Sequence, residues 1–93
     1  MRKHILKVNE KFWPALLAGE KTAEIRSIAD RDFREGHSVV MYPVDENGNR
    51  VGIPDIATFA ITHVLPGGQY GIEPGYAVLS IASFGEFPKE LNK

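Results

Sequence analysis

The alternation of hydrophobic and polar positions predicts a chain built mainly of β-strands. Five segments have the two-residue period or the β-branched composition of strands, namely residues 4–8, 21–26, 38–42, 56–65 and 76–82. In the second segment the alternation is strict, so Thr22 and Arg26 are expected on the same face as Glu24. Lys21 is expected on the opposite face.

One short helix is expected between the first two strands. Asn9 suits a helix N-cap, and the hydrophobic residues that follow it recur at helical spacing. Pro14 fits a helix only in the first turn, because its missing N–H would be unpaired there anyway. The helix should therefore begin near Trp13, and Gly19 provides a C-terminal stop.

The segments between the strands have the composition of loops. Residues 27–36 form a polar loop that holds one aromatic side chain, Phe33, and residues 45–49 contain the hairpin signal Asn-Gly. Residues 66–71 are rich in glycine and are expected to be flexible. The pattern predicts an α+β, mainly β fold, a small barrel or rolled sheet of about five strands with the helix against one opening. Closing the sheet would remove exposed edges.

Composition narrows the class of protein. The chain has 93 residues, of which 43% are hydrophobic and 25% charged, so we expect one domain over residues 1–85 and a polar C-terminal tail over residues 86–93. Apolar runs such as residues 59–61 are far shorter than the roughly 20 residues of a membrane span. The absence of cysteine excludes disulfides, thiolate metal sites and thiol catalysis. We therefore expect a soluble, cytoplasmic protein that contacts no membrane.

The charges are distributed unevenly along the chain. Residues 1–35 carry eight basic and six acidic side chains, whereas residues 36–93 carry three basic and six acidic ones. This asymmetry suggests an anionic partner for the first half, although an ordinary solvated surface explains it about as well.

Few motifs of known chemistry occur. There is no Walker loop, dinucleotide fingerprint or nucleophile elbow. The three histidines, His4, His37 and His63, lie in separate segments without metal-ligand spacing. We expect them at strand edges or on the surface, and we expect no metal site and no cofactor.

The segment from Gly19 to Arg26 is the most informative one. It places a lysine, a hydroxyl, a carboxylate and a guanidinium on one short strand. Lysine supplies a mobile charge for phosphate, and arginine offers a planar fork for phosphate or a base edge. The alternative is a structural strand whose Glu24 and Arg26 pair with neighbours at the surface.

In this segment the chain resembles the ASCH domain of the PUA-like superfamily. The resemblance rests on the order of a strand, a helix, Gly19-x-Lys21-Thr22-x-Glu24-Ile25-Arg26 and then Asp30-Arg31-Asp32-Phe33-x-x-Gly36. The chain is similar in particular to short, uncharacterised bacterial and phage proteins, through His4-Ile5-Leu6-Lys7 and through the Gly-x-x-Pro-Gly-Tyr-x-x-Leu-Ser motif of residues 71–80. The match covers roughly residues 4–82.

The resemblance implies a PUA-like barrel with a cleft beside the Gly-x-Lys strand that receives RNA or a nucleotide. Lys21 and Arg26 occupy the positions characteristic of ASCH domains, Thr22 and Glu24 lie between them, and Arg31 belongs to the following loop. Where the group has Gly-Asp after this loop, the chain has Gly-His at residues 36–37.

Some ASCH relatives are enzymes, and they provide an alternative function. Single-domain members hydrolyse the amide of acetylated cytidine with a Lys, a Thr and a Glu, and another member is reported as a ribonuclease. Lys21 matches their lysine, but Glu24 stands where their hydroxyl belongs, and residues 66–71 replace the helical insertion that carries their acid. A hydrolase would have to use a relocated pair of Thr22 and Glu24 with Lys21.

The preferred hypothesis is a small module that binds RNA or a nucleotide without catalysis. Lys21 and Arg26 would contact phosphate, Glu24 would accept hydrogen bonds from a base or ribose, and Arg31 would extend the basic rim. Tyr70 and Phe33 can stack on bases, although Phe33 is more readily explained as a loop anchor. The predicted nucleic-acid site is Lys21, Thr22, Glu24, Arg26, Arg31 and Tyr70. A third hypothesis is a phage-type accessory protein that binds a host protein.

Overall fold

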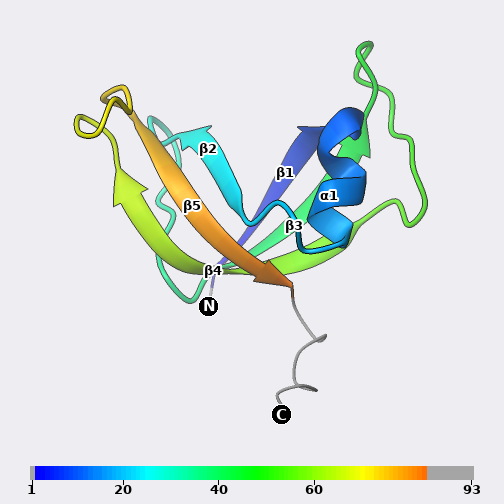
Figure 1. The fold of residues 1–93 in the computed structure, drawn as a ribbon, viewed down its shortest axis with the longest axis horizontal. Coiled ribbons are helices and arrows are strands. Elements are labelled where there is room, and N and C mark those ends of the chain that lie inside the picture. The colour runs from blue at the N-terminus through cyan, green and yellow to red at the C-terminus, as the bar shows by residue number, and fades with distance from the viewer. Residues whose placement is uncertain (1, 84–93) are drawn as a thin grey trace.

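A five-stranded sheet forms the body of the protein in the computed structural model, which describes residues 2–83 (Figure 1). The strands are β1 (Lys3–Asn9), β2 (Ala23–Ser27), β3 (Ser38–Val44), β4 (Ala57–Pro66) and β5 (Tyr76–Ser83). The expectation of a mainly-β fold with about five strands and one short helix is confirmed. The predicted tail over residues 86–93 lies outside the described residues.

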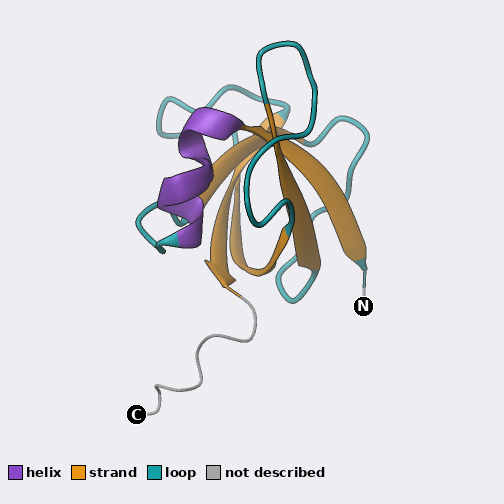
Figure 2. Ribbon diagram, turned by 90° about the vertical axis from the view of Figure 1, so that its right-hand side faces the viewer, coloured by secondary structure: helices purple, strands orange, loops and turns teal. Residues whose placement is uncertain are grey.

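The order of the strands in the sheet is β1-β3-β4-β5-β2. β1 runs parallel to β3, and the other neighbours are antiparallel. The sheet curls into a half-barrel, with β1 and β2 as its two edges (Figures 1 and 2). Within residues 2–83 no backbone ladder joins these edges, so the structure is a rolled sheet rather than a closed barrel.

The concave face of the sheet carries the hydrophobic core. Burial alternates along β1 and β5, where the second, fourth and sixth residues of each strand are buried. The helix adds Trp13 and Leu16 to the same cluster, and the loop before β3 adds Phe33, which is only 6% exposed. The interpretation of Phe33 as a loop anchor is therefore confirmed.

The helical segment follows the expected pattern. The Asn9 side chain accepts a hydrogen bond from the Lys11 backbone N–H at 2.9 Å and starts a 3-10 turn, η1 (Glu10–Phe12). The α-helix α1 (Trp13–Leu17) follows with Pro14 in its first turn, and Gly19 leaves it with a φ of 77°. Figure 2 shows the helix beside the curled strands. The Trp13 indole donates to the Pro54 carbonyl at 2.9 Å, which fixes the helix to the loop before β4.

Two irregular segments differ from simple sequence expectations. The Asn-Gly turn forms, but only an isolated bridge between Val44 and Arg50 follows it, so the return segment is not a strand. β4 contains a bulge between Ile61 and His63, which shifts its register against β5. The bulge places Ile61 in the core and His63 on the exposed face.

Among residues 2–83, no helix has the length and apolar character required to span a membrane.

Candidate functional site

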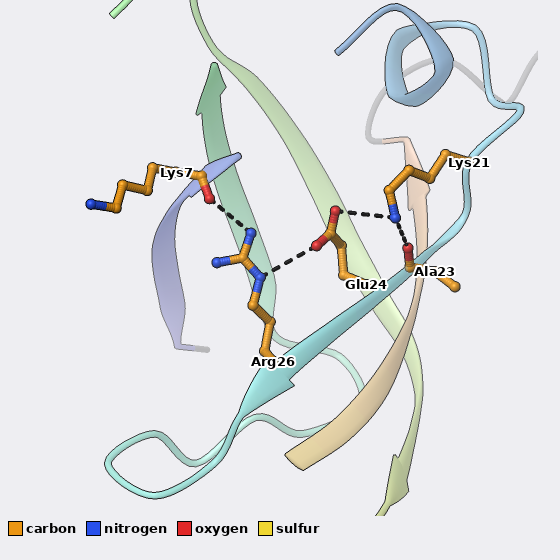
Figure 3. A network of polar contacts seen from close by, with 5 residues as sticks. All are labelled: Lys7, Lys21, Ala23, Glu24 and Arg26. Atoms are coloured by element: carbon orange, nitrogen blue, oxygen red, sulfur yellow. Dashed lines mark hydrogen bonds and ion pairs between the residues drawn. The ribbon is translucent and has the colours of Figure 1, made fainter. Parts of the chain in front are cut away.

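The structure brings Lys21, Glu24 and Arg26 together in one cluster of charges (Figure 3). Lys21 Nζ lies 3.4 Å from Glu24 Oε2, and Arg26 Nε lies 3.3 Å from Glu24 Oε1. Lys21 Nζ also donates a hydrogen bond to the carbonyl of Ala23. The Glu24 carboxylate thus lies between the ammonium group of Lys21 and the planar guanidinium group of Arg26.

β2 positions two of these side chains by its alternation. Glu24 pairs with Leu79 and Arg26 pairs with Ala77 in the register with β5, and both partners belong to the core. Both charged side chains therefore start from the concave face. The sequence prediction that Glu24 and Arg26 share a face is correct.

The prediction for Lys21 is wrong. Alternation from residue 21 placed Lys21 on the face opposite Glu24, but the strand begins only at Ala23. The backbone N–H of Lys21 donates to the carbonyl of Ala15 at the end of the helix, so residue 21 still belongs to the turn that leaves α1. Because it lies outside the strand, its side chain reaches the carboxylate of Glu24.

Glu24 is buried even though its partners are partly exposed. The side chain of Glu24 is 8% exposed, against 27% for Lys21 and 23% for Arg26. Removing a carboxylate from water costs several kcal/mol unless charges and hydrogen bonds replace the lost hydration. Glu24 Oε2 is fully buried and has no hydrogen-bond partner, since Lys21 provides an ion pair only. The alternative of a structural strand is thus right that Glu24 and Arg26 form ion pairs, but wrong in placing Glu24 at the surface.

Arg26 of β2 and Arg31 of the loop that follows it both bond to the edge strand β1. Arg26 Nη2 donates to the Lys7 carbonyl at 2.8 Å, as Figure 3 shows, and Arg31 Nη1 donates to the Ile5 carbonyl at 3.4 Å. Lys7 and Ile5 are alternate residues of β1, so their carbonyls point to the same side of this edge strand. The two guanidinium groups therefore lie along one strand edge.

Two predicted site residues lie outside the cluster. Thr22 is exposed, and its backbone carbonyl accepts from the N–H of Ile81. Within residues 2–83 no hydrogen bond of the Thr22 hydroxyl is present, and Thr22 makes no contact with Glu24 of the kind a relocated catalytic pair requires. Tyr70 lies in the loop before β5, is 85% exposed and has a φ of 52°.

The structure contains a histidine pair that the sequence patterns did not predict. His4 Nε2 lies 3.0 Å from His37 Nδ1, and the His4 ring centroid lies 4.5 Å from that of Phe33. His4 lies on the edge strand β1 but is only 3% exposed, so the expectation of a surface position is wrong for this residue. Burial, and then the neighbouring His37, lower the pKa of His4 below its usual 6.5. The period that His4 shares with Leu6 and Val8 was the available signal.

The described part of the chain holds no group of three or more His, Cys, Asp or Glu side chains that could bind a metal ion.

A cavity of about 280 Å³ lies beside β2, but on the other side of the strand. Its lining residues are Ile25, Gly71, Ile72, Glu73 and Tyr76. Ile25 alternates with Glu24 and Arg26, so it projects from the convex face of the sheet. Lys21 does not line this cavity.

Comparison with known proteins places the chain in a family. Among curated proteins none matches it. The model of a domain of unknown function, DUF3850, matches residues 3–81, which include all five strands up to Ile81 and the helix. The chain therefore belongs to the DUF3850 family.

Proposed function

We propose that this protein is a small PUA-like module of the ASCH type that binds RNA or a nucleotide at the cluster of Lys21, Glu24 and Arg26. The buried carboxylate of Glu24, with one oxygen that lacks a hydrogen bond, is the observation that carries the proposal. A buried acceptor without a donor is costly and calls for an explanation, and a ligand that supplies the donor is one.

The chemistry of the cluster matches the two parts of a nucleotide. Its two cations have side chains that are about a quarter exposed, so an anion can reach them. Lys21 supplies a point charge for a phosphate, and Arg26 supplies a planar fork. Once Lys21 turns from Glu24 to a phosphate, Glu24 Oε2 would be left to accept a hydrogen bond from a base amino group or a ribose hydroxyl.

Arg31 extends the same basic line. Ile5 and Lys7, whose carbonyls accept from Arg31 and Arg26, are two residues apart, and two residues of a strand span about 7 Å. Two guanidinium groups at this spacing suit successive phosphates of one strand. Tyr70 has an exposed ring that can stack on a base, but it lies in a separate loop.

A titration of the isotope-labelled protein tests the proposal. Amide shifts of residues 21–26 and 31 are followed while a short oligoribonucleotide or a nucleoside monophosphate is added at low ionic strength. We expect saturable shifts, weakening with salt as phosphate contacts require. Lys21→Gln should raise the dissociation constant about tenfold, because one charged contact is worth about 1.4 kcal/mol or more.

Lys11→Gln is the matched control. The ammonium groups of Lys11 and Lys21 lie 5.3 and 5.4 Å from the centroid of the Phe12 ring, but no ion pair joins Lys11 to Glu24 among the described residues. Equal effects of the two substitutions, or no shifts with any nucleotide, would refute the proposed site. If the wild type hydrolyses an acylated nucleoside and Lys21→Gln does not, the proposed binding module would have to be described as a hydrolase instead.

A further inference from the structure

The cavity on the convex face of β2 is separate from the charge cluster. Ser27 and Ile25 pair with Tyr76 and Val78 of β5, so Ile25 and Tyr76 lie on the same face, opposite Glu24. The loop that completes the cavity precedes β5, whereas the segment that leaves α1 contacts Ile81 near the end of β5. Figure 1 shows this loop, drawn in yellow, away from α1.

Glu73 is the one charged residue among the five that line the cavity. Ile25 is 58% exposed and Tyr76 41% exposed, so two large hydrophobic side chains lie uncovered on this face. Glu73 is the only charged residue between positions 64 and 83. Glu73 lines the cavity and is exposed, and none of the ion pairs within residues 2–83 involves it, so an acidic residue without a counter-ion stands at this cavity.

The loop that carries Glu73 is held in shape by its own hydrogen bonds. Gly68 N–H donates to the Ile72 carbonyl at 2.7 Å, and Ile72 N–H donates to the Gln69 carbonyl at 2.9 Å. The Gly67 N–H donates to the Tyr76 carbonyl at 2.7 Å. A wall that is already ordered loses little conformational entropy when it binds a ligand.

We propose that this cavity binds a lysine or arginine side chain of a partner polypeptide. The methylene stem of such a side chain would lie against Ile25 and Ile72, and its cationic group would meet the carboxylate of Glu73. Tyr76 offers an aromatic ring, which also attracts cations. Charge complementarity therefore selects a basic group with an apolar stem.

The size of the cavity supports the same occupant. Its volume of about 280 Å³ is near the lower limit of about 300 Å³ for pockets that enclose drug-sized ligands. It has room for one long side chain. An anionic ligand is also disfavoured here, because Glu73 would repel it.

Capped tripeptides with a central lysine or arginine provide a direct probe. The isotope-labelled protein is titrated with each peptide, and the amide signals of residues 25, 71–73 and 76 are followed. We expect saturable shifts with both basic peptides and none with the peptide that has a central glutamine. Glu73→Gln should weaken binding about fivefold, as expected for one partly exposed ion pair.

Glu46→Gln is the matched control, because it removes an exposed carboxylate in the turn after β3 and should leave the affinity unchanged. Ile25→Ala provides a second variant that removes an exposed wall without touching the core, and it should also weaken binding. The proposal is overturned if the glutamine peptide binds equally well, or if Glu73→Gln binds as the wild type does. Shifts of the same amides by a nucleotide, or tighter binding of free butylamine than of the peptides, would also overturn it.

Discussion

The two carboxylate oxygens of Glu24 have different partners. Oε1 faces the Nε of Arg26 at 3.3 Å, whereas Oε2 has only the ion pair with Lys21. The carboxylate is thus held in place but not fully hydrogen-bonded. A buried carboxylate with an unsatisfied oxygen stabilises the fold less than one whose oxygens both accept hydrogen bonds. The unsatisfied oxygen can still accept a hydrogen bond from a ligand.

His4 makes the stability of the protein depend on pH. Because its pKa is lowered in the folded state, the unfolded chain takes up the proton first as the pH falls. Between the folded and unfolded pKa values the unfolded state binds more protons, so the free energy of unfolding decreases with acidification. We expect stability to fall as the pH drops through about 6.5, the usual value for histidine, and then to level off with respect to this group.

Urea unfolding at a series of pH values from 8 to 5 measures this effect. His4→Phe removes the titrating group but keeps a ring beside Phe33, and it should flatten the profile. His63→Gln is the control, because His63 is exposed and pairs with Glu35 on the outer face. A profile in His4→Phe as steep as that of the wild type would contradict the prediction.

At the scale of elements, local signals predicted local structure well. Asn9, Pro14 and Gly19 act within one or two turns of their own position, so the start and end of the helix could be predicted from the sequence. The start of β2 could not, because it depends on a hydrogen bond from residue 21 to Ala15. Because β2 begins at residue 23 rather than 21, the Lys21 side chain lies on the side of Glu24.

Two further features of the site required the tertiary structure. The burial of Glu24 depends on pairing between β2 and β5, and the acceptor of Arg26 belongs to a strand at the opposite edge. The bulge in β4 could not be predicted either, because this strand contains no glycine that would indicate a bulge in the sequence. Alternation shows which residues share a face, but not which strands become neighbours.

The close backbone contacts in the loop before β5 can be tested by substitution of Gly67. A Cβ added to Gly67 would collide with the Glu73 carbonyl and would lie 2.7 Å from the Tyr76 carbonyl. We expect Gly67→Ala to lower the free energy of unfolding by about 2 kcal/mol, because backbone atoms cannot move aside cheaply. The amide of Ile72 should also lose protection from hydrogen exchange, since its bond belongs to the same turn.

Gly68→Ala is the matched substitution. Its Cβ would meet no atom within 4 Å, so only the positive φ of 86° opposes it, at a cost of about 1 kcal/mol. If the two variants are equally stable in urea unfolding, the proposed collision at Gly67 is wrong.

In a closed barrel, backbone hydrogen bonds would join the first and last strands of the sheet. In this protein, arginine side chains bond to the edge strand β1 instead. Arg26 and Arg31 reach across from the β2 side to the free carbonyls of β1. An edge strand with unpaired carbonyls invites pairing with other chains, and a bound guanidinium blocks that edge. The two arginines therefore protect β1 as well as provide positive charge.

Arg26→Lys separates the bridge from the charge. Lysine keeps a cation near Glu24 but loses the second nitrogen that bonds to Lys7, so we expect stability to fall by about 1 kcal/mol. Arg31→Lys should cost less, because its bond to Ile5 is longer, 3.4 Å against 2.8 Å. Urea unfolding of both variants gives the comparison, and the reverse order would show that Arg26 does not bridge the edges.

The strand order also governs when the charge cluster can form during synthesis. β1 and β2 are made first, yet neither pairs with the other, and Ser27 must wait for Tyr76 to gain its cross-strand partner. Until β5 has left the ribosome, Leu79 is not present to cover Glu24, and the carboxylate stays hydrated. Such distant pairings make folding slow. The nascent chain therefore cannot complete its candidate binding site before β5 has been made.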